Sequence, residues 1–120
     1  MSKAAISLTT GLEDSERVTV ALLVAVGDAE SGRDTTMFLT KEAVRLAVTG
    51  VARGVACDGC PPIPTLLSRY AAAGGTMIVC GICVDAKGLD PTTFVDNASK
   101  GGSVQLWEWI GDEGATTFSY

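Results

Sequence analysis

The chain has 120 residues, a hydrophobic fraction of 47% and a formal net charge of −5. This length predicts one domain over residues 1–120 and excludes two, and the absence of any basic cluster excludes the Lys/Arg-rich surface of a nucleic-acid-binding protein. The longest apolar run, Val20–Val26, is far shorter than the roughly 20 residues of a membrane-spanning helix, so membrane insertion is not expected.

The N-terminal part predicts a strand followed by a long, mostly apolar helix. Met1–Lys3 has neither the apolar core nor the cleavage site of a signal peptide, so we expect a cytoplasmic protein. Ala4–Thr9 forms the expected strand. Either Asp14 or Ser15 is suited to cap the helix that follows, and Gly32 is suited to end it.

The middle of the chain repeats this order of strand and helix. Thr35–Leu39 is rich in β-branched and aromatic residues and predicts a second strand, which a helix over Lys41–Val48 follows. Gly50–Gly59 predicts an irregular loop. Prolines then start a helix over Thr65–Ala73, which ends at a pair of glycines.

The C-terminal part supplies the strand that matters most for chemistry. Thr76–Val79 predicts a buried strand that runs directly into Cys80. A helix over Ser103–Ile110 and a last strand over Ala115–Ser119 complete the chain. Alternating strands and helices predict an α/β fold, a three-layer sandwich around a mostly parallel sheet of four or five strands. A mean hydropathy of +0.30 favours such a buried sheet together with apolar contacts between subunits.

The chain contains no histidine. This excludes Ser-His-Asp and Cys-His catalysis and every metal site with imidazole ligands. A nucleophile in this protein must therefore be activated by groups other than imidazole.

The motif Cys80-Gly81-Ile82-Cys83 is the main candidate for chemistry. Ligands of open α/β sheets bind at the carboxyl ends of the strands, where Cys80 is expected to lie. Unpaired backbone amides at the start of a following helix favour a thiolate over a thiol. We therefore expect Cys80 to be the nucleophile and Cys83 to be its neighbour or resolving thiol. The alternative is that Cys80 is an inert core residue.

A second pair, Cys57 and Cys60, has the same spacing as Cys80 and Cys83. Together the four cysteines have the spacing of a four-thiolate zinc or iron–sulfur site, and this alternative makes all four metal ligands. A second alternative is a redox role, in which Cys57, Cys60 or Cys83 forms a disulfide with Cys80. A third is that Cys57 and Cys60 are inactive residues of an exposed loop.

Four segments make the sequence similar to the DsrE/DsrF-like family, the sulfur-relay proteins that share the YchN-like fold. The end of the strand and the turn at Phe38–Thr40, followed directly by a helix, resemble the same segment of the family. Pro61–Leu67 resembles the helix start of one branch of the family, in which prolines precede leucines. Gly74–Cys83 resembles that branch's sequence of two glycines, a strand and CxxC. Gly88 follows Cys80 at the family's spacing.

This resemblance implies a homotrimer or homohexamer in which Cys80 carries a persulfide. Cys80 would accept sulfur from a donor protein and pass it to a cysteine of an acceptor protein, which would make the chain a sulfurtransferase-like carrier. No cofactor is expected outside the metal alternative, and a non-catalytic oligomer with the same fold is a further alternative. Trp107 is expected to point away from the face of Leu106, Trp109 and Ile110 and to anchor a subunit contact.

Overall fold

The strands of the computed structural model form one parallel sheet. The structure describes residues 2–120, and among these five strands lie in the order β4-β3-β2-β1-β5, with every neighbouring pair parallel. This confirms the predicted α/β class and its parallel sheet. In chain order the elements are β1 (Lys3–Leu8), η1 (Leu12–Asp14), α1 (Ser15–Glu30), β2 (Thr35–Leu39), η2 (Lys41–Ala47), α2 (Ile63–Ala72), β3 (Thr76–Cys80), α3 (Gly81–Ala86), η3 (Pro91–Thr93), β4 (Ala98–Gly101), α4 (Ser103–Ile110) and β5 (Ala115–Ser119).

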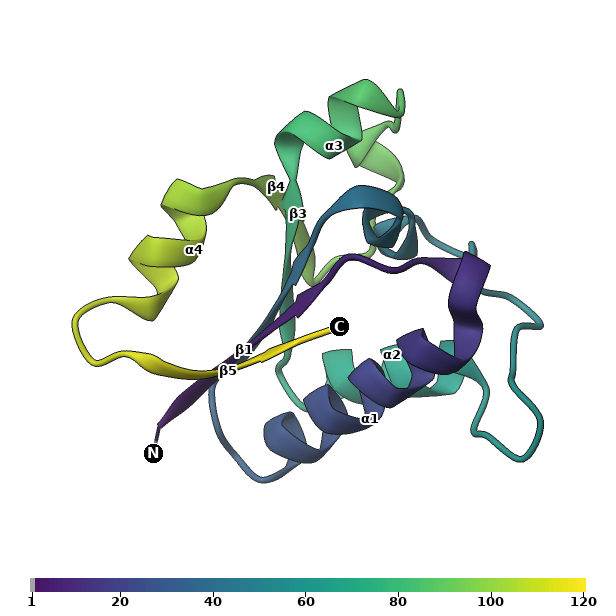
Figure 1. The fold of residues 1–120 in the computed structure, drawn as a ribbon, viewed down its shortest axis with the longest axis horizontal. Helices are drawn as coiled ribbons and strands as arrows, with labels where there is room; N and C mark the ends of the chain where they lie inside the picture. Colours follow the sequence, from purple (N-terminus) through teal and green to yellow (C-terminus); the bar gives the residue numbers. More distant parts are fainter. Residues whose placement is uncertain (1) are drawn as a thin grey trace.

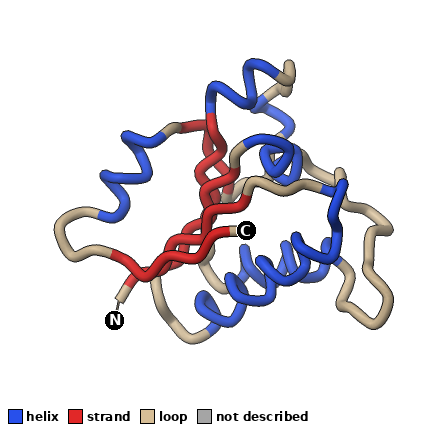
Figure 2. Tube along the Cα trace, viewed as in Figure 1, coloured by secondary structure: helices blue, strands red, loops and turns tan. Residues whose placement is uncertain are grey.

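Helices cover both faces of the sheet, as predicted, but unequally. α1 and α2 lie side by side on one face and α4 lies on the other, as Figures 1 and 2 show. The main core lies beneath α1 and α2, and it includes the inward side chains of the three central strands: Ile6, Leu8, Met37, Leu39, Met77 and Val79. α4 contains no fully buried residue, so the second face of the sheet is thinly covered. Among residues 2–120, no helix has both the length and the apolarity needed to cross a bilayer.

α1 begins where its sequence predicts. The Asp14 carboxylate accepts a hydrogen bond from the backbone N–H of Arg17 at 3.1 Å, which confirms Asp14 as one of the two candidate caps. The helix buries residues at positions 18, 22, 25, 26 and 29, a spacing that places one stripe of side chains against the sheet. This helix therefore forms because its cap and its apolar stripe agree.

Two predicted helices differ from those in the structure. Lys41–Ala47 is a 3-10 helix, and its buried residues Ala43 and Leu46, like Val44 and Ala47, are three positions apart. Side chains three residues apart eclipse in a 3-10 helix, so this conformation buries both pairs. α2 begins at Ile63 and not at Thr65, because Pro64 fits into a first helical turn and Ile63 is fully buried.

The strand β4 is missing from the sequence prediction. Its residues, Ala98–Gly101, are small or polar and none of them is fully buried, so they have no alternation of apolar and polar side chains. Its position is fixed by its neighbours, because Met77 N–H donates to Asn97 O at 2.9 Å and the Asn97 side-chain amide donates to Gly75 O at 3.0 Å. Tertiary pairing, and not local propensity, makes this segment a strand.

Tyr70 connects α2 to the sheet at the start of β3. Its side chain is fully buried, and its hydroxyl donates to Thr76 O at 2.7 Å, with Thr35 O at 3.2 Å. Burial raises the pKa of this phenol well above its ordinary value. A Cβ at Gly75 would overlap the Tyr70 ring, so glycine is required at this position.

Candidate functional site

The ends of β1, β2 and β3 meet at one edge of the sheet because these strands are parallel. We call this region the cysteine edge and define it as Thr9–Gly11, Thr40–Glu42 and Cys80–Cys83. The first two segments touch, since a Cβ at Gly11 would lie only 2.7 Å from the carbonyl oxygen of Glu42. Glycine at position 11 therefore allows the turns after β1 and β2 to approach each other.

Cys80 is the last residue of β3 and the residue that precedes α3, as the sequence predicts. Its thiol is free, and its side chain is partly buried against the core. The sulfur is therefore not sealed inside the molecule. Among residues 2–120, no amide of the first turn of α3 caps this sulfur, so the expected support from its own helix is not formed.

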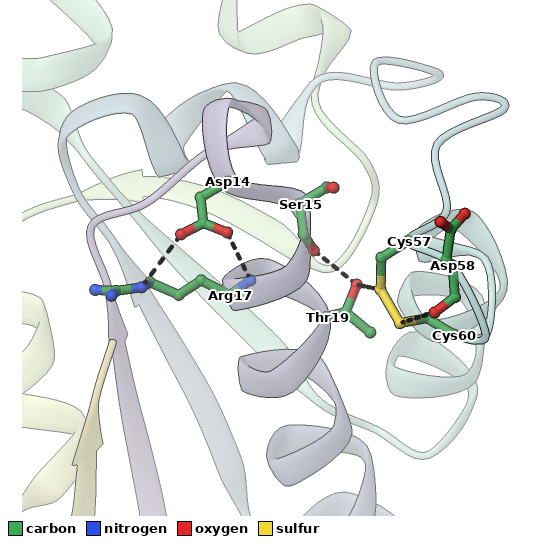
Figure 3. Close-up of a disulfide and its surroundings, with 7 residues drawn as sticks. All are labelled: Asp14, Ser15, Arg17, Thr19, Cys57, Asp58 and Cys60. Atoms are coloured by element: carbon green, nitrogen blue, oxygen red, sulfur yellow. Dashed lines mark hydrogen bonds and ion pairs between the residues drawn. A yellow bond between two sulfur atoms is a disulfide. The ribbon is translucent and has the colours of Figure 1, made fainter.

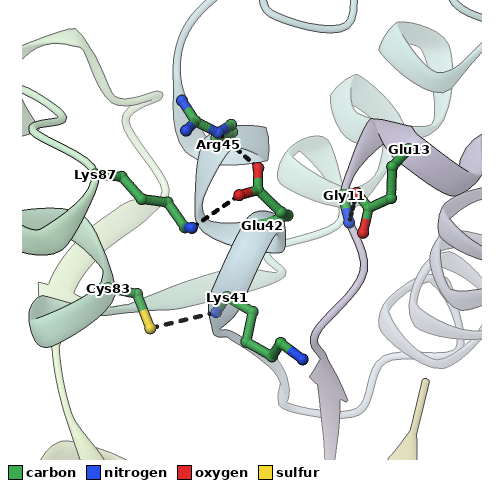
Figure 4. A network of polar contacts seen from close by, with 7 residues as sticks. All are labelled: Gly11, Glu13, Lys41, Glu42, Arg45, Cys83 and Lys87. Atoms are coloured by element: carbon green, nitrogen blue, oxygen red, sulfur yellow. Dashed lines mark hydrogen bonds and ion pairs between the residues drawn. The ribbon is translucent and has the colours of Figure 1, made fainter.

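Cys83 is the thiol that receives a backbone amide. The N–H of Lys41 donates to Cys83 Sγ, with an N···S distance of 3.3 Å (Figure 4). Cys83 is also a free thiol and is partly buried. The amide comes from the turn after β2, which lies next to β3 in the sheet. Sequence reasoning missed this contact because it joins residues 42 positions apart.

Ion pairs hold α3 on both of its sides. On one side, Lys87 Nζ lies 2.8 Å from Glu42 Oε1, and Arg45 Nε lies 2.7 Å from the other oxygen of the same carboxylate (Figure 4). On the other side, Lys100 Nζ lies 2.7 Å from Asp85 Oδ1. The Lys87 ammonium, and after it the Arg45 guanidinium, lowers the pKa of Glu42 from its ordinary value.

This arrangement is suited to thiol exchange. Cys80 and Cys83 are separated by one turn of chain, at an edge where the backbone that follows the neighbouring strand β2 presents an N–H donor. A fixed N–H donor next to a sulfur atom stabilises negative charge that develops on it during a reaction. The Lys87–Glu42 ion pair holds the end of α3 close to the start of η2. Because Glu42 directly follows Lys41, this ion pair also keeps Cys83 next to the Lys41 N–H.

The other two cysteines lie in the loop between η2 and α2. Cys57 and Cys60 form a disulfide with each other, with a Cα–Cα distance of 5.2 Å (Figure 3). Cys57 Sγ lies 3.7 Å from Thr19 Oγ1 of α1. The structure thus pairs Cys57 with Cys60, whereas the redox alternative pairs one of the other cysteines with Cys80.

The structure does not bring the four cysteines together. Within residues 2–120, no three His, Cys, Asp or Glu side chains are close enough to hold one metal ion. Cys57 and Cys60 are linked to each other, while Cys80 and Cys83 remain free thiols. The four-thiolate set of Cys57, Cys60, Cys80 and Cys83 is therefore not formed, and we derive no chemistry from it.

The comparisons with known proteins agree on one family and one fold. The model of the DsrE/DsrF-like family matches residues 2–118. The YchN protein of E. coli is 23% identical, with a TM-score of 0.81 over 100% of both chains. A conserved protein of unknown function from Bacteroides thetaiotaomicron is 18% identical, with a TM-score of 0.66 over 99% of this chain and 95% of that one.

A third solved structure extends the fold to an archaeal protein of unknown function. This protein, from Methanobacterium thermoautotrophicum, is 10% identical and has a TM-score of 0.67 over 100% of both chains. None of the curated proteins matches this chain. Identities this low establish the shared fold and leave the chemistry to be argued from the residues of this chain.

Proposed function

The chain belongs to the DsrE/DsrF-like family, and on this basis we propose that it is a sulfur carrier in which Cys80 receives a sulfane sulfur atom and passes it on. One observation carries the proposal: Cys80 and Cys83 are free, partly exposed thiols at the carboxyl end of an interior strand of a parallel sheet. Substrates of such sheets bind at this edge. With no histidine in the chain, reaction at sulfur needs only the thiolate and backbone donors.

The proposed step is an exchange between sulfur atoms. The Cys80 thiolate attacks the outer sulfur of a donor persulfide, an S–S bond forms at Cys80 Sγ, and the donor's own S–S bond breaks to release a thiolate. An acceptor thiolate then attacks the outer sulfur of the Cys80 persulfide and regenerates the Cys80 thiolate. The two exchanges balance, and no external oxidant or reductant takes part.

Cys83 is proposed to act as the resolving thiol. When no acceptor is present, the Cys83 thiolate attacks the inner sulfur of the Cys80 persulfide, which forms a Cys80–Cys83 disulfide and releases hydrosulfide. The Lys41 N–H next to Cys83 Sγ supports this role, because it holds the Cys83 side chain at the edge of the sheet where β3 ends with Cys80. Cys83→Ser is therefore expected to lengthen the lifetime of the persulfide.

Mass spectrometry tests the carrier proposal. Trypsin cleaves after Arg69 and Lys87, so residues 70–87 carry Cys80 and Cys83 on a peptide separate from Cys57 and Cys60. After incubation with a polysulfide, this peptide should gain about 32 Da, one sulfur atom, before alkylation. The gain should be lost in Cys80→Ser and retained in Cys83→Ser. In the native chain the gain is transient, because Cys83 converts the persulfide into a Cys80–Cys83 disulfide that is about 2 Da lighter than the two thiols. A gain that persists in Cys80→Ser, or no gain in Cys83→Ser, would contradict the proposal and favour a non-catalytic role.

We also propose that the chain assembles as a homo-oligomer through α4. Trp107 and Val104 of this helix are 69% and 63% exposed, and Ile82, at the start of α3, is 83% exposed. The exposure of Trp107 confirms that it points away from the molecule's own core. Exposed aromatic and aliphatic side chains such as Trp107 and Val104 are typical of subunit contacts, and Ile82 is a further exposed apolar residue, two positions after Cys80 in the chain.

A further inference from the structure

The Cys57–Cys60 disulfide has no part in the proposed carrier reaction and contributes little to holding the fold together. It joins residues three positions apart within one loop and links no helix or strand to another. The entropy that a disulfide removes from the unfolded chain grows with the length of the loop it closes, and this loop is short. The Ile63 N–H also donates to Val55 O at 3.0 Å, which closes the loop around the two cysteines without the sulfur bond.

The two sulfur atoms have different surroundings, as Figure 3 shows. Cys57 Sγ faces α1, where it lies 3.7 Å from Oγ1 of the buried residue Thr19. Cys60 Sγ lies 3.7 Å from Asp58 O, on the solvent-exposed side of the loop. An external thiol therefore reaches Cys60 more readily than it reaches Cys57.

The hydroxyl of Thr19 favours the reduced form of Cys57. The Thr19 hydroxyl donates its proton to Ser15 O at 2.7 Å, so its oxygen is free to accept. A disulfide sulfur has no hydrogen to donate, whereas the Cys57 thiol formed by reduction does. Reduction therefore adds an S–H···O hydrogen bond at a buried oxygen, which stabilises the reduced pair once Cys57 is protonated.

From these contacts we infer that Cys57 and Cys60 form a second thiol–disulfide exchange site, whose substrate is an external thiol that attacks Cys60. The incoming thiolate bonds to Cys60 Sγ, the Cys57–Cys60 bond breaks, and Cys57 leaves as a thiolate that takes up a proton. A second external thiolate then attacks the mixed disulfide. In total, two external thiols are oxidised to one disulfide, and the chain gains two electrons and two protons.

A redox titration of the full chain tests this inference independently of the carrier proposal. The double variant Cys80→Ser/Cys83→Ser leaves only Cys57 and Cys60 to titrate, and both lie on the tryptic peptide of residues 54–69. In graded glutathione buffers, both cysteines should become alkylated together in one reversible transition. Reduction by glutathione identifies small thiols as the substrate, and reduction only by a thioredoxin-type protein dithiol identifies a protein partner. Resistance to both would overturn the inference.

Two single variants test which sulfur is attacked. The variant Cys57→Ser keeps only the Cys60 thiol of this pair, and Cys60→Ser keeps only the Cys57 thiol. The Cys60 thiol should react with glutathione disulfide about tenfold faster than the Cys57 thiol, because access to the sulfur governs the rate. Thr19→Val keeps the shape of Thr19 and removes the acceptor, so the exchange equilibrium should shift about threefold toward the disulfide. Equal rates for the two thiols would contradict the assignment of Cys60 as the attacked sulfur, and no shift in Thr19→Val would contradict the stabilisation of reduced Cys57 by Thr19.

Discussion

Lys41 has a backbone conformation that glycine usually supplies. Its φ is +54°, and among residues 2–120 it is the only residue other than glycine with a positive φ. Such a conformation costs a side chain about 1 kcal/mol, and strained backbone residues are concentrated at functional sites. At Lys41 the strained residue is the one whose N–H donates to Cys83 Sγ. This coincidence supports a role for the amide beyond packing.

Glu42 predicts how the stability of the chain depends on pH. Hydrogen bonds from Lys87 and then Arg45 lower its folded-state pKa below the unfolded value of 4.5. A lowered carboxyl pKa means that the unfolded state binds more protons, so the stabilisation is complete above about pH 4.5 and is lost as pH falls through the folded-state pKa. Glu42→Gln removes this contribution at neutral pH and has no such effect in acid.

Urea unfolding of both proteins at several pH values measures this difference. The native chain should be the more stable at pH 7, and the gap should close as the pH falls below the folded-state pKa of Glu42. Glu16→Gln is the matched control, because Glu16 is an exposed glutamate that belongs to none of the ion pairs among residues 2–120. A gap for Glu42→Gln that does not change with pH would contradict the role assigned to the ion pairs.

At the scale of the elements, the Tyr70 hydroxyl is expected to stabilise the junction of α2 with β3. Tyr70→Phe removes the donor to Thr76 O and leaves that carbonyl without its shortest hydrogen bond. The free energy of unfolding should fall by about 1 kcal/mol, measured by urea denaturation. The other tyrosine of the chain gives the control: Tyr120 is only half-buried, so Tyr120→Phe should change the stability by less than about 0.5 kcal/mol. Equal losses would mean that the Thr76 contact contributes nothing specific.

Elements with a strong local pattern are the ones that the sequence could predict. β1, β2, β3, β5, α1 and α4 have apolar periodicity, caps or β-branched runs, and each is present close to its predicted range. β4 has none of these signals and depends on pairing with β3. The 3-10 conformation of Lys41–Ala47 likewise depends on what the segment packs against, which a helical pattern does not contain.

In the candidate site, too, some features could be predicted from the sequence and others could not. The position of Cys80 at the end of β3 followed from the buried run before it, and the parallel order of the strands brings the turns after β1, β2 and β3 together. The Lys41–Cys83 contact and the contact of Cys57 with Thr19 join segments 42 and 38 residues apart. Such contacts depend on the exact path of two loops, so cysteine spacing alone left the partner of each cysteine open.

At the scale of the whole molecule, the thin cover of the second sheet face predicts self-association. α4 buries none of its residues completely, and it is held to the sheet in part by Lys3, whose Nζ donates to Trp109 O at 2.7 Å and lies 5.2 Å from the centre of the Trp109 ring. Trp109 is thus used within the chain, while Trp107 points outward and is 69% exposed. A second copy that covers Trp107 would complete the layer that a single chain leaves thin.

Trp107→Glu should therefore dissociate the assembly, because a carboxylate at the centre of an apolar contact loses its solvation on association. Light scattering coupled to gel filtration should give the native chain a mass of three or six times 12.3 kDa and the variant a mass of 12.3 kDa. Leu23→Glu is the control, since Leu23 is an exposed apolar residue of α1, on the opposite side of the sheet, and its variant should keep the native mass. The emission of Trp109, which both variants retain, reports whether each is folded. A native chain with a mass of 12.3 kDa would show that the chain does not self-associate. A folded Trp107→Glu variant with the native oligomeric mass would show that α4 is not the contact surface, because association would then not need its exposed Trp107.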